Sequence, residues 1–118
     1  MTTSVDTATA HLPLTTMAFE ILLAVASNAS TGYEVMLAIE KRTAGSLSPN
    51  PGTLYRAVDR LAGEGLITVR KGPAGTTARR SLTISPLGQR VLTAESDRLA
   101  GQIAAARALA HGTDQAPS

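Results

Sequence analysis

The sequence predicts a mainly α-helical fold that carries one small β-hairpin, and three observations predict it. Between residues 15 and 64, apolar residues recur at helical spacing behind capping residues. Two short stretches that alternate apolar and polar residues then flank a loop rich in glycine and proline. After residue 85, apolar residues recur close to a seven-residue period. We therefore expect one domain in which the hairpin precedes a long last helix.

Composition excludes several classes of protein. With 118 residues, of which 43% are hydrophobic and 17% charged, the chain is long enough to fold around a modest core. There is no cysteine, which excludes a disulfide framework, a thiol nucleophile and a cysteine metal site. No apolar run approaches the roughly 20 residues that span a bilayer, and the N-terminus does not resemble a signal peptide. We expect a cytoplasmic protein with no membrane partner.

Charge is segregated along the chain. Residues 41–90 hold nine of the 11 bases and only two acids, a net charge of +7, whereas the rest carries −5. Such segregation favours a polyanionic partner for one region, although a solvated basic surface is an alternative. The nine bases are Lys41, Arg42, Arg56, Arg60, Arg70, Lys71, Arg79, Arg80 and Arg90.

The chain begins with a predicted tail, residues 1–11, and a first helix. Thr15 or Thr16 can cap this helix, which is expected to end near Ser27. Its apolar residues surround most of the circumference, which indicates burial on more than one side. In so small a domain, we expect the second side to face a partner subunit.

Two further helices follow after short connections. Thr31 and Glu34 have the spacing of a capping box that opens a helix through about Arg42. The next helix spans 50–64, with Asn50 as its cap and Pro51 at its first position. Its apolar stripe consists of Leu54, Val58 and Leu61, while Thr53, Arg56 and Arg60 share a different face.

Residues 67–71 and 79–84 are expected to pair as a β-hairpin around the loop at 72–77. Three helices followed by a hairpin are the element order of a winged helix-turn-helix, here residues 12–84. The last helix, residues 85–110, would be roughly 37 Å long, too long for so small a core to cover. We expect it to be a dimerisation helix; folding back on the first helix is the alternative. Residues 111–118 are a predicted tail.

Three stretches together resemble the PadR-like transcriptional regulators of the short subtype: TGYEVMLAIEKRTAG (31–45), SPNPGTLYRAVDRLAGEGLI (48–67) and ARRSLTISPLGQRVL (78–92). The resemblance implies a winged-helix homodimer that binds a palindromic operator and usually represses. It also implies a last helix that packs on the partner's first helix, and small aromatic effectors. Arg56 stands where the family commonly has proline, and Ser81 and Leu82 where it commonly has two tyrosines.

Helix 50–64 is predicted to enter the major groove of double-stranded DNA through its N-terminal end. Arg56 is expected to bind guanine and Arg60 a phosphate. Tyr55 either donates its hydroxyl to a phosphate or packs as a half-buried ring, and Tyr33 has the same two interpretations. The hairpin bases either follow the DNA backbone or protect a strand edge. The predicted DNA-binding residues are Tyr33, Asn50, Thr53, Tyr55, Arg56, Arg60, Arg70, Lys71, Arg79 and Arg80.

A homodimer interface is predicted from the apolar residues of the first and last helices: Phe19, Leu23, Leu92, Leu99, Ile103 and Ala106. An effector pocket lined by Phe19, Leu23, Leu92 and Leu99 is one possibility at this interface, and a filled dimer core is the other. No cofactor and no metal site are predicted.

Two other classes of function compete with DNA binding. A winged-helix protein-interaction module would not require bases on both the helix and the hairpin, and this chain has them on both. An enzyme is not expected, because His11 and His111 both lie in the predicted tails and no catalytic grouping of Ser, His and acid appears.

Overall fold

The computed structural model describes residues 7–72 and 80–114. It contains the helices α2 (Thr16–Ala26), α3 (Gly32–Arg42), α4 (Pro51–Gly63) and α5 (Pro86–Asp114). The strands β1 (Ile67–Arg70) and β2 (Ser81–Ile84) form an antiparallel hairpin between α4 and α5. The predicted fold class, mainly helical with one small hairpin, is confirmed.

The three helices that precede the hairpin begin at the predicted caps. Side-chain oxygens of Thr15, Thr31 and Asn50 accept hydrogen bonds from backbone N–H groups three residues later, at 3.0, 3.1 and 2.8 Å. Each cap satisfies a donor that the helix itself leaves unpaired. The capping box of α3 reaches one residue further back than the cap, because Glu34 Oε1 accepts from Ser30 N at 2.8 Å.

The register of the hairpin separates an inner from an outer face. Ile67 pairs with Ile84 and Val69 with Leu82, and these four side chains are buried or half-buried. The outer pairs are Thr68 with Thr83 and Arg70 with Ser81, and all four are exposed. In addition, Leu82 N donates to Ser30 O at 2.8 Å, so β2 is anchored to the turn between α2 and α3.

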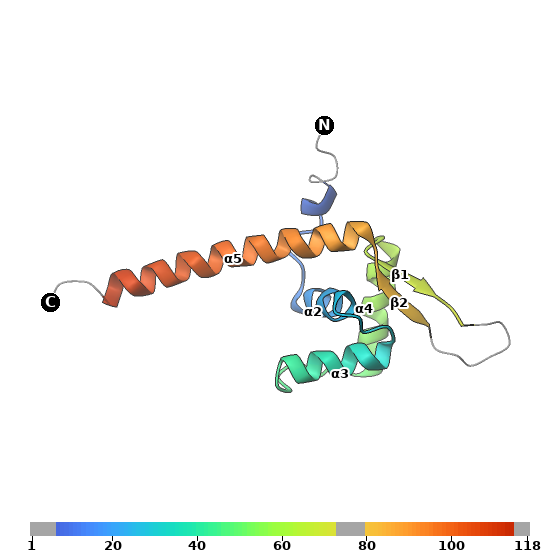
Figure 1. The fold of residues 1–118 in the computed structure, drawn as a ribbon. Helices are drawn as coiled ribbons and strands as arrows, with labels where there is room; N and C mark the ends of the chain where they lie inside the picture. Colours follow the sequence, from blue (N-terminus) through green and yellow to red (C-terminus); the bar gives the residue numbers. More distant parts are fainter. Residues whose placement is uncertain (1–6, 73–79, 115–118) are drawn as a thin grey trace.

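The hydrophobic core lies around α2, which packs against α3, α4, α5 and β2 (Figure 1). The predicted stripe of α4 faces this core, with Leu54 and Val58 fully buried and Leu61 4% exposed. Burying each such side chain contributes about 1.5–3 kcal/mol, which fixes the rotation of α4 about its axis. Other fully buried side chains are Ile21, Leu22, Val35, Ile39, Leu66 and Val91.

Two carboxylates are buried with arginine partners. Glu20 makes α2 less uniformly apolar than predicted, and it pairs with Arg42 at the end of α3. Glu95 is 1% exposed and accepts from Arg98 at 2.6 and 2.8 Å and from Leu14 N at 3.1 Å. The hydrogen bond from Arg98 lowers the pKa of Glu95, outweighing burial, which raises it; the Leu14 N–H lowers it further.

The ends of the chain depart from the predicted tails. Residues 7–9 form a helical turn in which Ala8 is only 3% exposed, so the packed domain begins before the predicted boundary at residue 12. At the other end, α5 continues to Asp114, beyond the predicted end at residue 110. Residues 1–6 and 115–118 of the predicted tails lie outside the described residues.

The first part of α5 packs against α2, whereas its second part projects beyond the other elements and does not fold back on α2 (Figure 1). The side chains of residues 100–111 are all exposed. The radius of gyration is 17.5 Å, compared with about 13.5 Å for a compact domain of this length. Across residues 7–72 and 80–114, no helix has both the length and the hydropathy that crossing a bilayer requires.

Candidate nucleic-acid interface

Helix α4 presents its arginines away from the core. Arg56 lies nearly opposite the stripe of Leu54, Val58 and Leu61, because consecutive residues are 100° apart on a helix. Its side chain is exposed and forms no ion pair with a described residue. Arg56 is therefore the basic side chain of α4 that is best placed to contact a ligand surface laid against the helix.

The start of α4 is more constrained than the sequence suggested. Asn50 is exposed, but its Oδ1 accepts the Thr53 N–H at 2.8 Å, so only its amide NH₂ group can donate outward. Thr53 is half-buried. Pro51 and Gly52, which lie between these two residues in the first turn of α4, are exposed.

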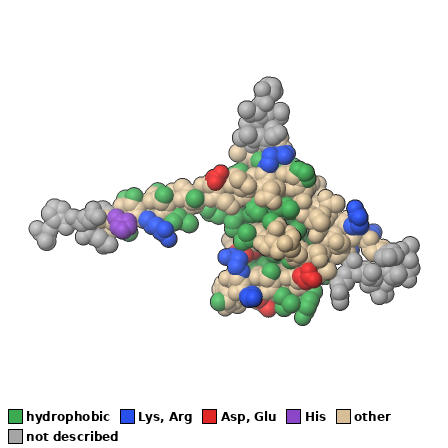
Figure 2. Space-filling view, in the orientation of Figure 1, with side chains coloured by type: hydrophobic (Ala, Val, Ile, Leu, Met, Phe, Trp, Pro, Cys, Tyr) green, Lys and Arg blue, Asp and Glu red, His purple; other side chains and the backbone are tan. Residues whose placement is uncertain are grey.

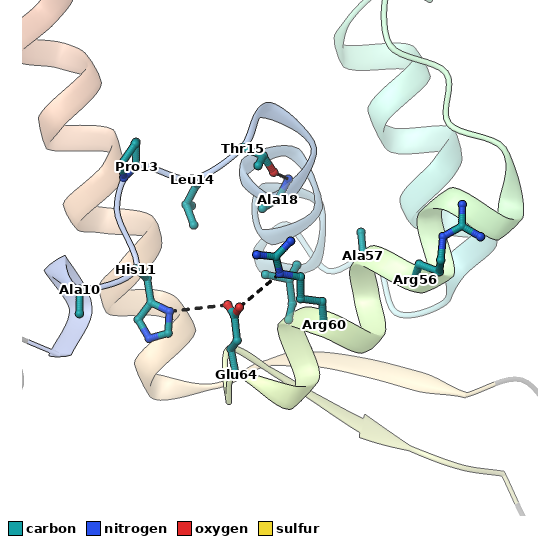
Figure 3. A pocket seen from close by; sticks show the side chains of 11 residues that line it. Ala10, His11, Pro13, Leu14, Thr15, Ala18, Arg56, Ala57, Arg60 and Glu64 are labelled. Carbon is teal, nitrogen blue, oxygen red and sulfur yellow. Dashed lines mark hydrogen bonds and ion pairs between the residues drawn. The ribbon is translucent and has the colours of Figure 1, made fainter.

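Arg60 lies at a cleft of about 410 Å³ between α4 and the segment that precedes α2. Its Nε is 3.4 Å from Glu64 Oε2, and His11 Nδ1 is 3.6 Å from Glu64 Oε1. Figure 3 shows His11 and Arg60 on two sides of the Glu64 carboxylate, with Arg56 farther along α4. The Arg60 side chain is 78% exposed, so solvent screens this pair strongly and Arg60 remains accessible.

The hairpin bases lie on different faces. Arg80 precedes β2 and lies on the same face of the hairpin as Leu82 and Ile84, two and four residues further on. It therefore points toward α4, where it donates to Asp59 Oδ1 at 3.1 Å. Arg70 lies on the outer face, and both Arg70 and Lys71 are exposed without an ion pair to any described residue. Arg79, also predicted to bind DNA, lies outside the described residues.

The two tyrosines have different surroundings. Tyr55 is 39% exposed, and its ring packs so closely on α3 that a Cβ atom added to Gly32 would be 2.5 Å from the Tyr55 hydroxyl. This geometry favours the half-buried interpretation of Tyr55. Tyr33 is 58% exposed at the start of α3, which leaves its hydroxyl accessible.

Sequence reasoning missed two residues of this surface. Asp59 was counted only as one of two acids in the basic segment, yet it holds Arg80. Gly32 accommodates the Tyr55 ring, because a Cβ atom at this position would overlap it. The four-residue spacing of Tyr55 and Asp59, which places both on one flank of α4, was the available signal.

The residues predicted for a subunit interface fall into three groups. Ile103 and Ala106 are exposed on the projecting part of α5, where Figure 2 shows hydrophobic side chains along the helix. Phe19, Leu23 and Leu99 are half-buried. Leu92 is 6% exposed within the protomer's own core, which leaves it little surface for a partner, so it does not belong with the others.

A groove of about 410 Å³ runs between α2 and α3, and we call it the α2–α3 groove. Its lining is mostly apolar, with charged groups at one end: Glu20, Leu23, Ala24, Ser27, Ala38, Ile39, Lys41 and Arg42. Within the described residues, no three His, Asp or Glu side chains gather as a metal site would require.

Three helices, a hairpin beside the exposed face of the third helix, and a long C-terminal helix define a winged-helix regulator. Consistent with this class, the model of the transcriptional regulator PadR-like family matches residues 21–94. The chain belongs to this family, whose members are transcriptional regulators and not enzymes.

A curated relative is also a transcriptional regulator, and solved structures share the fold. Over 46 residues the chain is 44% identical to the transcriptional regulator YqjI of Escherichia coli K12, a match that covers 39% of this chain and 22% of YqjI. The chain therefore spans about a fifth of the length of that curated relative. A transcriptional regulator from Clostridium thermocellum, Cth-833, has a TM-score of 0.67 at 24% identity, covering 77% of this chain and 86% of that one. Bacillus subtilis PadR in complex with operator DNA has a TM-score of 0.57 at 21% identity, covering 67% and 46%.

Proposed function

We propose that this PadR-family regulator binds a palindromic operator in double-stranded DNA as a homodimer and represses transcription. The observation that supports this most is the exposed face of α4. It carries Arg56 opposite the buried stripe, with the base of the hairpin alongside. A rigid helix whose core side is fixed and whose outer side is basic is suited to insertion into the major groove.

The residues have separate roles in this proposal. Arg56 donates two of its guanidinium N–H groups, one to O6 and one to N7 of guanine, the commonest specific contact in the major groove. The Asn50 amide and Thr53 contact base edges or phosphates near the helix start. Arg60, Arg70, Lys71 and Tyr33 bind phosphates, which position the protein without reading sequence.

The homodimer is built by α5 in this proposal. The projecting part of α5 exposes Ile103 and Ala106, and an isolated apolar helix face of this length favours burial against a second copy. On α2, Phe19, Leu23 and Ala26 form a half-buried face at i, i+4 and i+7. The partner's α5 crosses this face and covers the mouth of the α2–α3 groove. Two copies of α4 then lie about one DNA turn apart, roughly 34–36 Å.

Effector release and location complete the proposal. A small aromatic molecule that binds beside Phe19 and Leu23, where the partner's helix crosses α2, would change the separation of the two α4 helices and so release the operator. The protein acts in the cytoplasm, where a regulator of transcription meets its operator DNA.

Salt dependence of DNA binding tests this function. If Arg60, Arg70 and Lys71 each neutralise one phosphate, the dimer neutralises about six, and log K plotted against log salt has a slope near −5. Fluorescence anisotropy with a labelled duplex over a range of salt concentrations measures this slope. A slope shallower than about −2 would instead support a protein-interaction module that does not use its basic surface on DNA.

A further inference from the structure

Arg80 is held on two sides by residues of α4. Its Nη1 donates to Asp59 Oδ1 at 3.1 Å, and its guanidinium carbon lies 5.4 Å from the centroid of the Tyr55 ring. Tyr55 and Asp59 are four residues apart and therefore adjacent on one flank of the helix. A guanidinium above an aromatic ring and beside a carboxylate uses both its planar face and its N–H edge.

The Tyr55 ring is itself fixed from the other side. It packs directly on the backbone of the first turn of α3, because Gly32 has no side chain to prevent the approach. Gly32, Tyr55, Arg80 and Asp59 thus form one continuous stack across α3, α4 and the base of β2, which we call the Tyr55–Arg80 stack. Only two residues further along β2, Leu82 N donates to Ser30 O.

The surroundings of Arg80 differ from those of the other bases on this surface. The Arg80 side chain is 34% exposed, compared with 78% for Arg60. The adjacent Asp59 carboxylate cancels its charge locally, so the pair adds little to the positive field of the surface. Turning Arg80 toward a phosphate would give up both the carboxylate and the ring. Arg70 and Lys71 have neither partner.

We propose that Arg80 is a positioning residue, which sets the orientation of the hairpin relative to α4 and does not bind phosphate. Asp59 and Tyr55 act through it. This inference rests on the proposed function and revises the role first expected for Arg80. The phosphate contacts of the hairpin base then come from Arg70 and Lys71.

Asp59→Ala separates positioning from simple charge. Removing an acid beside a polyanion strengthens DNA binding if charge alone matters. The positioning role predicts the opposite result: affinity for the preferred DNA site falls about tenfold, because Arg80 is released. Anisotropy at one fixed salt concentration measures the wild type and the variant, and tighter binding of Asp59→Ala would overturn the inference.

Salt slopes of Arg80→Ala and the matched variant Arg70→Ala provide the second test. Loss of one phosphate contact in each protomer makes the slope shallower by about 1.8 in a dimer. Arg70→Ala should show this change, whereas Arg80→Ala should weaken binding and leave the slope unchanged. A slope change of equal size in both variants would identify Arg80 as a phosphate contact.

Hydrogen exchange in the free protein keeps this inference separate from the proposed function. Asp59→Ala should accelerate exchange of the backbone amides of β2 by several-fold while those of the first half of α5 stay as in the wild type. If wild-type protein does not bind DNA but β2 still loses protection, the function fails and the stack stands. Unchanged exchange in β2 would refute the stack even if DNA binding is confirmed.

Discussion

Arg56 and Arg80 carry the same charge within one small surface, yet their neighbours give them different roles. Arg56 has no acid within reach among the described residues, and it points away from the core. Arg80 contacts both Asp59 and the Tyr55 ring. The role of a base in DNA binding therefore depends on what else its guanidinium already contacts.

Arg56→Ala is expected to reduce affinity for the preferred DNA site by about 1–3 kcal/mol and to relax the base preference at one position of each half-site. The reason is the loss of a bidentate contact to guanine. Competition binding with single-base variants of the site measures both effects. Arg70→Ala is the control, because loss of a phosphate contact weakens binding to all sequences alike. Identical behaviour of the two variants on specific and random DNA would contradict the division of roles.

At the residue scale, the sequence predicted the orientation of a side chain wherever it depends only on spacing within one helix. The 100° step of the helix was enough to place Arg56 opposite Leu54 and Val58. It could not decide between the two interpretations of Tyr55, because the answer depends on Gly32, which lies 23 residues earlier in the chain. Asp59 was missed for the same reason, since its partner Arg80 comes from the hairpin.

At the scale of elements, Glu95 joins α5 to the segment that enters α2. Its carboxylate accepts from the Leu14 N–H and from two nitrogens of Arg98. At its start, α5 approaches the turn between α4 and β1 so closely that a Cβ atom on Gly88 would lie 2.0 Å from Leu66 O. These two contacts hold the first half of α5 rigidly on the winged-helix domain.

Glu95→Gln is expected to lower the free energy of unfolding by about 1.5–3 kcal/mol at neutral pH, because it removes hydrogen bonds to a buried charged acceptor. The folded state lowers the pKa of Glu95 below its ordinary value of 4.5. The carboxylate therefore contributes stability above that value, and the contribution is lost as pH falls through the lowered pKa.

Denaturant unfolding at several pH values checks this prediction. The difference in stability between wild type and Glu95→Gln should be largest near pH 7 and should shrink below about pH 4.5, the ordinary value. Asp97→Asn is the control, because that carboxylate is exposed on α5 and forms no ion pair with a described residue. A difference that stays constant with pH would contradict the role given to Glu95.

The helix starts were predictable because each capping side chain accepts a hydrogen bond from the N–H group only three residues later, so the signal is local in the sequence. Strand limits were less so: β1 ends at Arg70 and β2 begins at Ser81, inside the predicted ranges. The end of α5 was placed too early, since the helix continues through Gly112, although glycine commonly follows the last residue of a helix. The junction at Glu95 was missed because Leu14 is 81 residues away.

For the whole molecule, the main feature is the part of α5 that extends beyond the core. It contributes to an elongated shape, with extents of 72, 42 and 20 Å along the three principal axes. A helix of 29 residues is about 43 Å long, and a single protomer covers only its first half. The exposed apolar residues of the remainder are the physical basis for proposing a second subunit.

Ile103→Asp is expected to convert the dimer to a monomer, because it places a charge in the proposed apolar interface. Analytical ultracentrifugation measures the change, and the salt slope for DNA should fall to about half. Ala108→Asp is the control, since it adds the same charge on the opposite side of α5. If both variants remain dimeric, α5 is not the dimerisation element.

Selection of preferred duplexes from a random pool tests the central claim most directly, because one measurement reports both the reading helix and the pairing of subunits. We predict enrichment of an inverted repeat that contains guanine in each half-site, with half-site centres one helical turn apart, about 10 base pairs. Recovery of sequences without symmetry, or of no enriched sequence at all, would contradict the account.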